Sequence, residues 1–387
     1  MLGQSSAKEV LAPALPTVPA PIPFAKIIGQ GKAVAVLEDA VASGRVHHAW
    51  VLEGPVGVGK RTAALAFASL LLDPTTETGL SGGVVCDEDS PVQRLLRAGT
   101  HPDLALINKE LARFHDDSDV RKRKQTSISV DVVRQFLLSQ GALSPGAPTS
   151  MRSRAGRVFI IDEAELMNVQ AQNAILKYLE EPPPRVVLML VCNAPQLLLP
   201  TIRSRCQRVA FGSLSRGQLD HWLADAQERG AVPAFENEAR EFLLSFADGS
   251  PGMLTRAIEG NVAGWWEKLK PLLSIAASGK HAVELGAAMA GLVDDWAKAH
   301  VEQNELASKE AANHTAASWL FRLLAWHATT RLKSQIAESG QKQAMLEGVE
   351  PIALREIDAI QAAQQELDAN VGLALVMEKL SAELVAS

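Results

Sequence analysis

A glycine-rich loop that ends in lysine constrains the fold of this chain more than any other feature. Gly54, Gly57, Gly59 and Lys60 have the spacing of a phosphate-binding loop, between a short apolar run and a long one. Glycines let backbone N–H groups surround phosphate oxygens, the helix N-terminus adds a favourable partial charge, and lysine neutralises the terminal phosphates. The pattern predicts a strand, a nucleotide-binding loop and a helix over residues 62–72.

The residue after Lys60 departs from the motif. Serine or threonine is required there as a magnesium ligand, whereas this chain has Arg61. Arginine cannot bind a metal cation, and Thr62 comes one residue too late, because such a shift rotates a helical side chain by about a quarter turn. We expect a site for ATP or ADP, with magnesium present only if nucleotide is bound, and weak or absent hydrolysis by the chain itself.

A second apolar run, residues 158–161, ends in two carboxylates. Asp162 would orient metal-bound water, and Glu163 would polarise the attacking water. Acidic residues also suit the first turn of a helix, but the upstream phosphate loop favours the catalytic interpretation. Asn193 follows another apolar run and is placed to hold water or a γ-phosphate, although an asparagine before Pro195 suits a turn nearly as well.

Short apolar runs alternate with helical stretches along residues 24–212. This alternation predicts an α/β domain with a parallel sheet flanked by helices. The expected strands are residues 49–52, 104–107, 158–161 and 186–192, and one helix is expected over residues 166–181. Proline-rich residues 1–23 predict a disordered leader. Residues 213–262 predict a small helical lid, and residues 263–387 predict a separate all-helical domain.

Composition limits which partners and which cellular compartment are expected for this chain. The chain has 38 basic and 44 acidic residues, a net charge of −6, so any nucleic-acid contact is expected to be local or made through partners. Three scattered cysteines are too few for a disulfide framework and fit a reducing cytoplasm. No run of about 18 apolar residues occurs, and no membrane segment is expected.

Several stretches resemble bacterial DNA polymerase III clamp-loader subunits, which are AAA+ proteins. They are residues 24–30, 48–55, 99–103, 173–183, 202–206 and 367–375. The most specific element is the triplet that contains Arg205. The resemblance implies that Arg205 is a finger that reaches the nucleotide of a neighbouring subunit and stabilises charge on the transferring phosphoryl group. Without the flanking motif, an exposed loop arginine would be the default interpretation.

Two departures separate delta-prime-type subunits from the hydrolysing gamma/tau type. Arg61 interrupts the phosphate loop, and Gly252 stands where motor subunits carry a sensor arginine. The resemblance therefore implies a delta-prime-type subunit in a hetero-pentamer with gamma/tau and delta, which contributes Arg205, ring rigidity and a helical collar (residues 263–387). The complex would load the sliding clamp onto primed DNA.

Two alternatives stay open. An active gamma/tau-like ATPase would use Lys60, Asp162 and Glu163 in cis, and a structural adaptor would need only its collar helices. Many family members also carry a four-cysteine zinc module, but this region offers only Cys86, so we predict no zinc.

The candidate catalytic residues are Asp162, Glu163 and Arg205, and the candidate nucleotide-binding residues are Gly54, Gly57, Gly59, Lys60, Arg61, Thr62 and Asn193.

Overall fold

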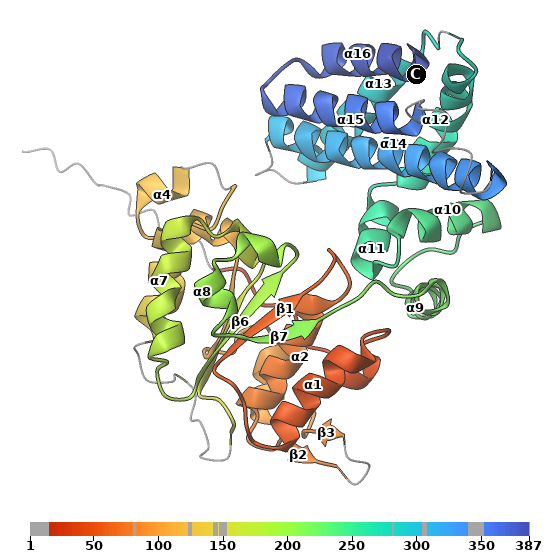
Figure 1. The fold of residues 1–387 in the computed structure, drawn as a ribbon. Coiled ribbons are helices and arrows are strands. Elements are labelled where there is room, and N and C mark those ends of the chain that lie inside the picture. The colour runs from red at the N-terminus through yellow and green to blue at the C-terminus, as the bar shows by residue number, and fades with distance from the viewer. Residues whose placement is uncertain are drawn as a thin grey trace, which may run out of the picture. The chain divides into compact units, whose positions relative to one another are not determined.

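A computed structural model describes two compact units (Figure 1). The first comprises Met1–Asp225 and Gly249–Gly252, and the second comprises Ala226–Asp248 and Met253–Ser387. The residues that the structure describes are 15–79, 83–122, 126–141, 146, 153–280, 282–303, 308–339 and 352–386. Across these ranges no helix is both long and apolar enough to cross a membrane.

The first unit is built around a five-stranded parallel sheet in the order β4-β5-β6-β1-β7. Its strands are β1 (Ala49–Glu53), β4 (Leu104–Ile107), β5 (Arg157–Ile161), β6 (Val186–Cys192) and β7 (Gln207–Ala210). The expected parallel α/β fold is confirmed. Strand β7 was not expected, because it lies at the sheet edge and only Val209 of its four residues is buried.

Helices cover both faces of this sheet (Figure 1), which is why its central strands β5, β6 and β1 are largely apolar. Val158 and Ile160 pack with α1 (Gly31–Ala42) and α2 (Lys60–Leu72), whereas Phe159 and Ile161 face the side of α7. The other helical segments are η1 (Phe24–Lys26), α3 (Pro91–Arg97), η2 (Lys109–Phe114), α4 (Ser118–Lys122), α5 (Val130–Val133), η3 (Arg134–Leu138), α6 (Ser139–Gly141), η4 (Ala164–Leu166), α7 (Val169–Glu180), η5 (Pro195–Leu197) and α8 (Pro200–Arg203). A small antiparallel hairpin pairs β2 (Glu77–Thr78) with β3 (Val84–Val85).

The helix expected over residues 166–181 begins three residues later. Asn168 is its N-cap, and its Oδ1 accepts the N–H of Ala171 at 2.8 Å. Leu166 instead ends the short 3₁₀ turn η4. A capping asparagine satisfies an N–H that the first helical turn leaves without a partner, so it sets where the helix starts.

All regular secondary structure in the described residues of the second unit is helical. Its helices are α10 (Asn237–Ala247), α12 (Val262–Ala277), α13 (Leu285–Gln303), α14 (Lys309–Ser339), α15 (Ile352–Asp368) and α16 (Leu373–Ala386), while α9 (Arg216–Glu228) and α11 (Pro251–Glu259) have residues in both units. Trp266 and Trp326 pack edge to face with ring centroids 5.1 Å apart, beside Phe242. The division into lid and collar stays a prediction.

The described part of the predicted leader has no helix or strand. Residues 15–23 run as an irregular segment, and residues 1–14 lie outside the described ranges. The Val18 N–H donates to the Gly99 carbonyl at 3.3 Å, and the Val18 side chain packs against the sheet core. This end of the leader is therefore held by a backbone hydrogen bond and an apolar contact.

Candidate nucleotide-binding site

The phosphate loop joins β1 to α2, in the strand and helix context that the motif requires. Gly54, Gly57 and Gly59 have φ angles of 147°, 77° and 102°, in the region that only glycine adopts freely. A Cβ at Gly54 would also lie 2.2 Å from the carbonyl oxygen of Phe211. The backbone conformation of the loop therefore requires glycine at these three positions, whether or not a ligand is bound.

Protein donors hold five consecutive carbonyls of the loop, residues 54–58. The donors are Lys60 Nζ for Gly54 (2.6 Å) and Pro55, Ser250 Oγ for Val56 (2.8 Å), the Gly252 N–H for Gly57 (2.8 Å) and Gln30 Nε2 for Val58 (3.1 Å). Hydrogen bonds to buried or half-buried carbonyls are costly to leave unmade. The shape of the loop is therefore maintained by the chain's own groups.

Lys60 and Asn193 meet at the loop. Lys60 is 3% exposed, and its Nζ donates to Asn193 Oδ1 at 2.8 Å. Asn193 Nδ2 in turn donates to Glu165 Oε1 at 2.6 Å. Burial lowers the pKa of Lys60 to about 8, while the nearby Glu165 carboxylate opposes that shift. An ammonium group in this position remains charged at neutral pH and is oriented by its acceptors.

Arg61 lies against the carboxylate that was expected to serve a metal. Its Nη1 is 3.0 Å from Asp162 Oδ2, and the two side chains are 54% and 14% exposed. Burial raises the pKa of Asp162, and the Arg61 charge works against that rise. These residues do not fit a magnesium ion: the ligand position on α2 carries a guanidinium, and that guanidinium already pairs with Asp162. Thr62 is half-buried on α2.

Glu163 has a left-handed backbone conformation, and its side chain pairs with a lysine. Its φ of 52° is unusual for a residue with a side chain. Glu163 Oε2 lies 3.1 Å from Nζ of Lys109, the first residue of η2, which follows β4. Sequence reasoning missed Lys109. The signal that could have found it is its place just after a strand that neighbours β5, because parallel strands end at a common edge of the sheet.

Arg205 lies apart from the loop, between α8 and β7. Its Nη2 is 2.9 Å from Glu180 Oε1 on α7, and its Nη1 donates to the Thr201 carbonyl at 3.1 Å. The Arg205 side chain is 37% exposed. The structure thus brings Gly54, Gly57, Gly59, Lys60, Arg61, Asp162 and Asn193 together and places Arg205 elsewhere on the unit.

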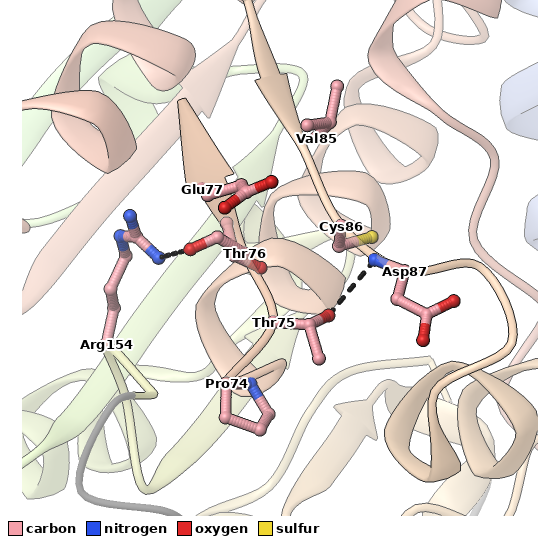
Figure 2. A pocket seen from close by; sticks show the side chains of 8 residues that line it. All are labelled: Pro74, Thr75, Thr76, Glu77, Val85, Cys86, Asp87 and Arg154. Carbon is pink, nitrogen blue, oxygen red and sulfur yellow. Dashed lines mark hydrogen bonds between the residues drawn. The ribbon is translucent and has the colours of Figure 1, made fainter. Parts of the chain in front are cut away.

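The hairpin region after α2 contains a second, polar hollow. Figure 2 shows its lining, which includes Cys86, Glu77 and Arg154, and its volume is about 780 Å³. Burial raises the pKa of Cys86 to about 11, with nearby carboxylates adding to the effect, so the thiol stays protonated at neutral pH. Within the described ranges, no three His, Cys, Asp or Glu side chains gather as a metal site.

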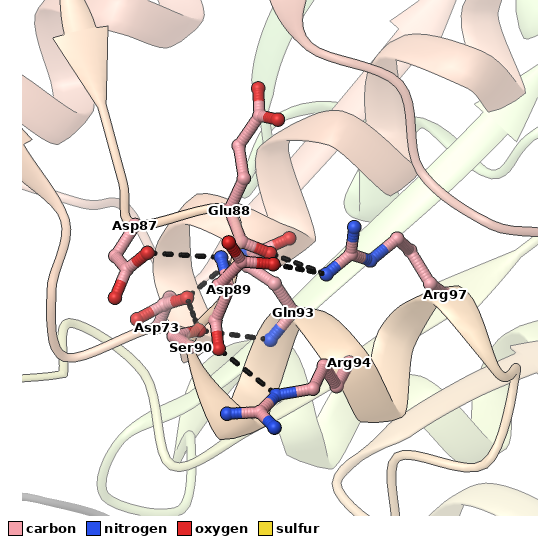
Figure 3. A network of polar contacts seen from close by, with 8 residues as sticks. All are labelled: Asp73, Asp87, Glu88, Asp89, Ser90, Gln93, Arg94 and Arg97. Carbon is pink, nitrogen blue, oxygen red and sulfur yellow. Dashed lines mark hydrogen bonds and ion pairs between the residues drawn. The ribbon is translucent and has the colours of Figure 1, made fainter.

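A buried carboxylate anchors the segment between this hairpin and α3. Asp73 Oδ2 accepts hydrogen bonds from Ser90 Oγ at 2.6 Å and from Gln93 Nε2 at 3.0 Å (Figure 3). Asp73 Oδ1 accepts from Thr75 Oγ1 at 2.7 Å. All of these partners are neutral donors of the same chain, so Asp73 has a structural role here.

Comparisons with known proteins agree on one relationship. Residues 29–215 match the family model described as DNA polymerase III, delta subunit. The DNA polymerase III subunit delta' of Pseudomonas aeruginosa is 37% identical over 205 residues, 53% of this chain and 53% of that protein. The tau subunit of Salmonella typhimurium is 31% identical over 230 residues, 59% of this chain and 32% of that protein.

A solved structure of a Thermotoga maritima DNA polymerase III gamma subunit-related protein has a TM-score of 0.44 and 16% identity, with 92% of this chain and 99% of that chain covered. The chain spans about half the length of the delta' relative and a smaller share of the tau relative. By sequence, the chain is similar to the delta' and gamma/tau subunits of DNA polymerase III, and its residues 29–215 match the model of the DNA polymerase III delta subunit family.

Proposed function

We propose that this chain is a delta-prime-type subunit of a DNA polymerase III clamp loader, which completes the ATPase site of a neighbouring subunit and has little or no ATPase activity of its own. One observation supports the proposal. The magnesium position of the chain's own loop is taken by Arg61, whereas a second arginine, Arg205, is partly exposed outside that loop. Arg61 pairs with Asp162 at the chain's own loop, whereas Arg205 lies outside that loop and is 37% exposed.

Arg205 has the chemistry that such a role requires. A guanidinium offers planar N–H donors that match phosphate oxygens, and an arginine finger stabilises the charge that develops during phosphoryl transfer. Its partner Glu180 is 52% exposed, so their ion pair is solvated and weak. Exchange of Glu180 for the phosphates of a neighbouring subunit would therefore cost little.

The assembly is part of the same proposal. The chain would join gamma/tau and delta subunits in a hetero-pentamer, with the collar helices at residues 263–387 as its oligomerisation element. Through that complex it would act on the sliding clamp and primed DNA in the cytoplasm. Its loop would bind ATP or ADP through Lys60 and Asn193, whose contact supports this part of the proposal.

An active gamma/tau-like ATPase is the second candidate. The phosphate-loop spacing of the glycines and the Lys60–Asn193 contact at 2.8 Å favour it, as does the 31% identity to a tau subunit. The Arg61–Asp162 pair argues against it, because Arg61 replaces one expected magnesium ligand and pairs with the other, Asp162. Robust ATP turnover by the isolated chain would favour this candidate over the delta-prime role.

The test is clamp- and DNA-stimulated ATP turnover by a reconstituted loader that carries Arg205→Ala in this chain alone. Turnover at the dependent site should fall by roughly 10³-fold, as expected for loss of an arginine finger. Arg205→Lys should restore little, since lysine lacks the planar fork. Arg208→Ala is the matched control, because Arg208 also pairs with a glutamate, Glu53, and is 53% exposed. Unchanged turnover of an intact Arg205→Ala complex would remove the trans role.

A further inference from the structure

We propose that the loop binds a nucleoside di- or triphosphate without a divalent cation, and that the Arg61 guanidinium takes the place of the metal between Asp162 and the phosphates. This deepens the proposed function and rests on it only in treating the loop as a nucleotide site that does not hydrolyse. It differs from the expectation that magnesium enters with the nucleotide.

The loop is organised before any ligand arrives. The carbonyls of residues 54–58 are engaged by Lys60, Ser250, Gly252 and Gln30. A preformed loop of this kind presents backbone N–H groups to an anion, and binding does not have to fix its conformation. The phosphate-binding part of the motif is therefore intact, and only its metal-binding part has changed.

The carboxylates that would attract a metal already have protein partners. Arg61 Nη1 lies 3.0 Å from Asp162, and Lys109 Nζ lies 3.1 Å from Glu163. A magnesium ion beside Asp162 would have to displace a guanidinium and then remain next to its positive charge. The magnesium ion and the guanidinium would repel each other, because both carry positive charge, and the Arg61–Asp162 ion pair would be lost.

Arg61 is suited to contact phosphates while it keeps Asp162. A guanidinium has five N–H donors, and the ion pair with Asp162 uses Nη1. The side chain is 54% exposed and follows Lys60 at the N-terminus of α2, on the strand-end side where the phosphates would lie. Arginine binds phosphate oxygens through charge-assisted, often paired hydrogen bonds, so it can bridge a carboxylate and a phosphate as a metal would.

The experiment measures binding of fluorescent N-methylanthraniloyl-ADP and the corresponding ATP analogue to the full chain, in magnesium and in EDTA. The wild-type chain should bind equally well or more tightly in EDTA. Arg61→Thr restores the residue type of the motif and should bind at least about tenfold more weakly in EDTA than in magnesium. Arg208→Thr removes an arginine of nearly equal exposure, 53%, that also pairs with a carboxylate, and should behave like wild type.

Manganese provides a readout independent of affinity. With Mn²⁺ in place of Mg²⁺ and ADP present, electron paramagnetic resonance should show no protein-bound manganese for the wild type and bound manganese for Arg61→Thr. The proposal is overturned if wild-type binding is lost in EDTA, or if neither nucleotide binds in either buffer. Both results would leave the Arg205 test untouched, so failure here is distinguishable from failure of the trans-acting role of Arg205.

Discussion

The backbone N–H of Gly252 donates to the carbonyl oxygen of Gly57 at 2.8 Å, and this contact exists because residue 252 has no side chain. A Cβ there would lie 2.9 Å from Gly57 Cα and 3.1 Å from Gly57 O. The resemblance to clamp-loader subunits implies that Gly252 marks the loss of a sensor arginine. The structure adds that the same glycine lets residues 249–252 pack against the phosphate loop.

Gly252→Ala should weaken this contact and destabilise the loop. Backbone atoms of Gly57 cannot move aside as a flexible side chain would, so we expect a loss of about 1–3 kcal/mol in the free energy of unfolding. Thermal unfolding measures the effect. Gly217→Ala is the control, because a Cβ there meets nothing within 4 Å. Equal unfolding midpoints for the two variants would contradict the packing argument.

Nucleotide affinity should depend on the protonation of Lys60. Its pKa in the free protein is lowered to about 8, so the ammonium loses its charge as the pH rises above that value. Affinity for fluorescent ADP should then fall by up to about tenfold per pH unit, because binding takes up one proton. Lys60→Arg stays charged and should remove this dependence. A flat wild-type profile through pH 8 would contradict the prediction.

The lowered pKa of Lys60 also affects the stability of the fold. Stability should rise with pH, whereas nucleotide affinity should fall. The unfolded lysine has a pKa of 10.5, so between about 8 and 10.5 the unfolded chain binds the proton and the folded chain does not. The contribution of Lys60 to the free energy of unfolding therefore increases as the pH rises through this window.

In the second unit, His327 should make stability fall in mild acid. Burial lowers its pKa from 6.5 to about 4, and the neighbouring Arg331 adds to the shift. The unfolded histidine binds a proton first, so stability is lost as the pH falls from 6.5 towards 4, by roughly 1–2 kcal/mol after allowance for solvent screening.

Thermal unfolding between these pH values measures the loss, and His327→Gln should flatten the curve. Glu356, which pairs with Arg331, has a pKa raised by burial and acts in the opposite direction, since the folded chain binds its proton more readily. If the wild-type stability depended on pH as little as that of the variant, protonation of His327 would not contribute to the free energy of unfolding.

Asp103 and Arg157 form a buried ion pair whose disruption should be costly. Arg157 Nη2 lies 2.9 Å from Asp103 Oδ1, and the side chains are 9% and 0% exposed. Asp103→Ala should destabilise the first unit by about 3–5 kcal/mol, because it leaves a buried charge without its carboxylate. The double variant Asp103→Leu with Arg157→Met should recover most of the loss.

Denaturant unfolding tests this prediction, with Glu238→Ala as the control. Glu238 pairs with Lys270 at 2.8 Å in the second unit, but it is 83% exposed, so its loss should hardly change the midpoint. Equal effects of Asp103→Ala and Glu238→Ala would mean that burial of the Asp103 pair does not matter for stability.

Strongly periodic or fully apolar segments were predictable. Residues 104–107 and 186–192 match β4 and β6, since strands buried on both faces must be apolar throughout. Edge strand β7 escaped prediction because three of its four residues are exposed. Helix α7 was expected too early because apolar spacing alone cannot show that Asn168 acts as its cap.

The sequence by itself determined the strand, loop and helix of the nucleotide site, because glycine spacing and a following lysine have few other physical uses. It also showed that Arg61 breaks the metal-binding pattern. Only the tertiary structure decided what Arg61 and Gly252 do instead. Asp162 lies 101 positions after Arg61, and Gly57 lies 195 positions before Gly252. Contacts across such separations depend on how strands are ordered and packed, which no local pattern encodes.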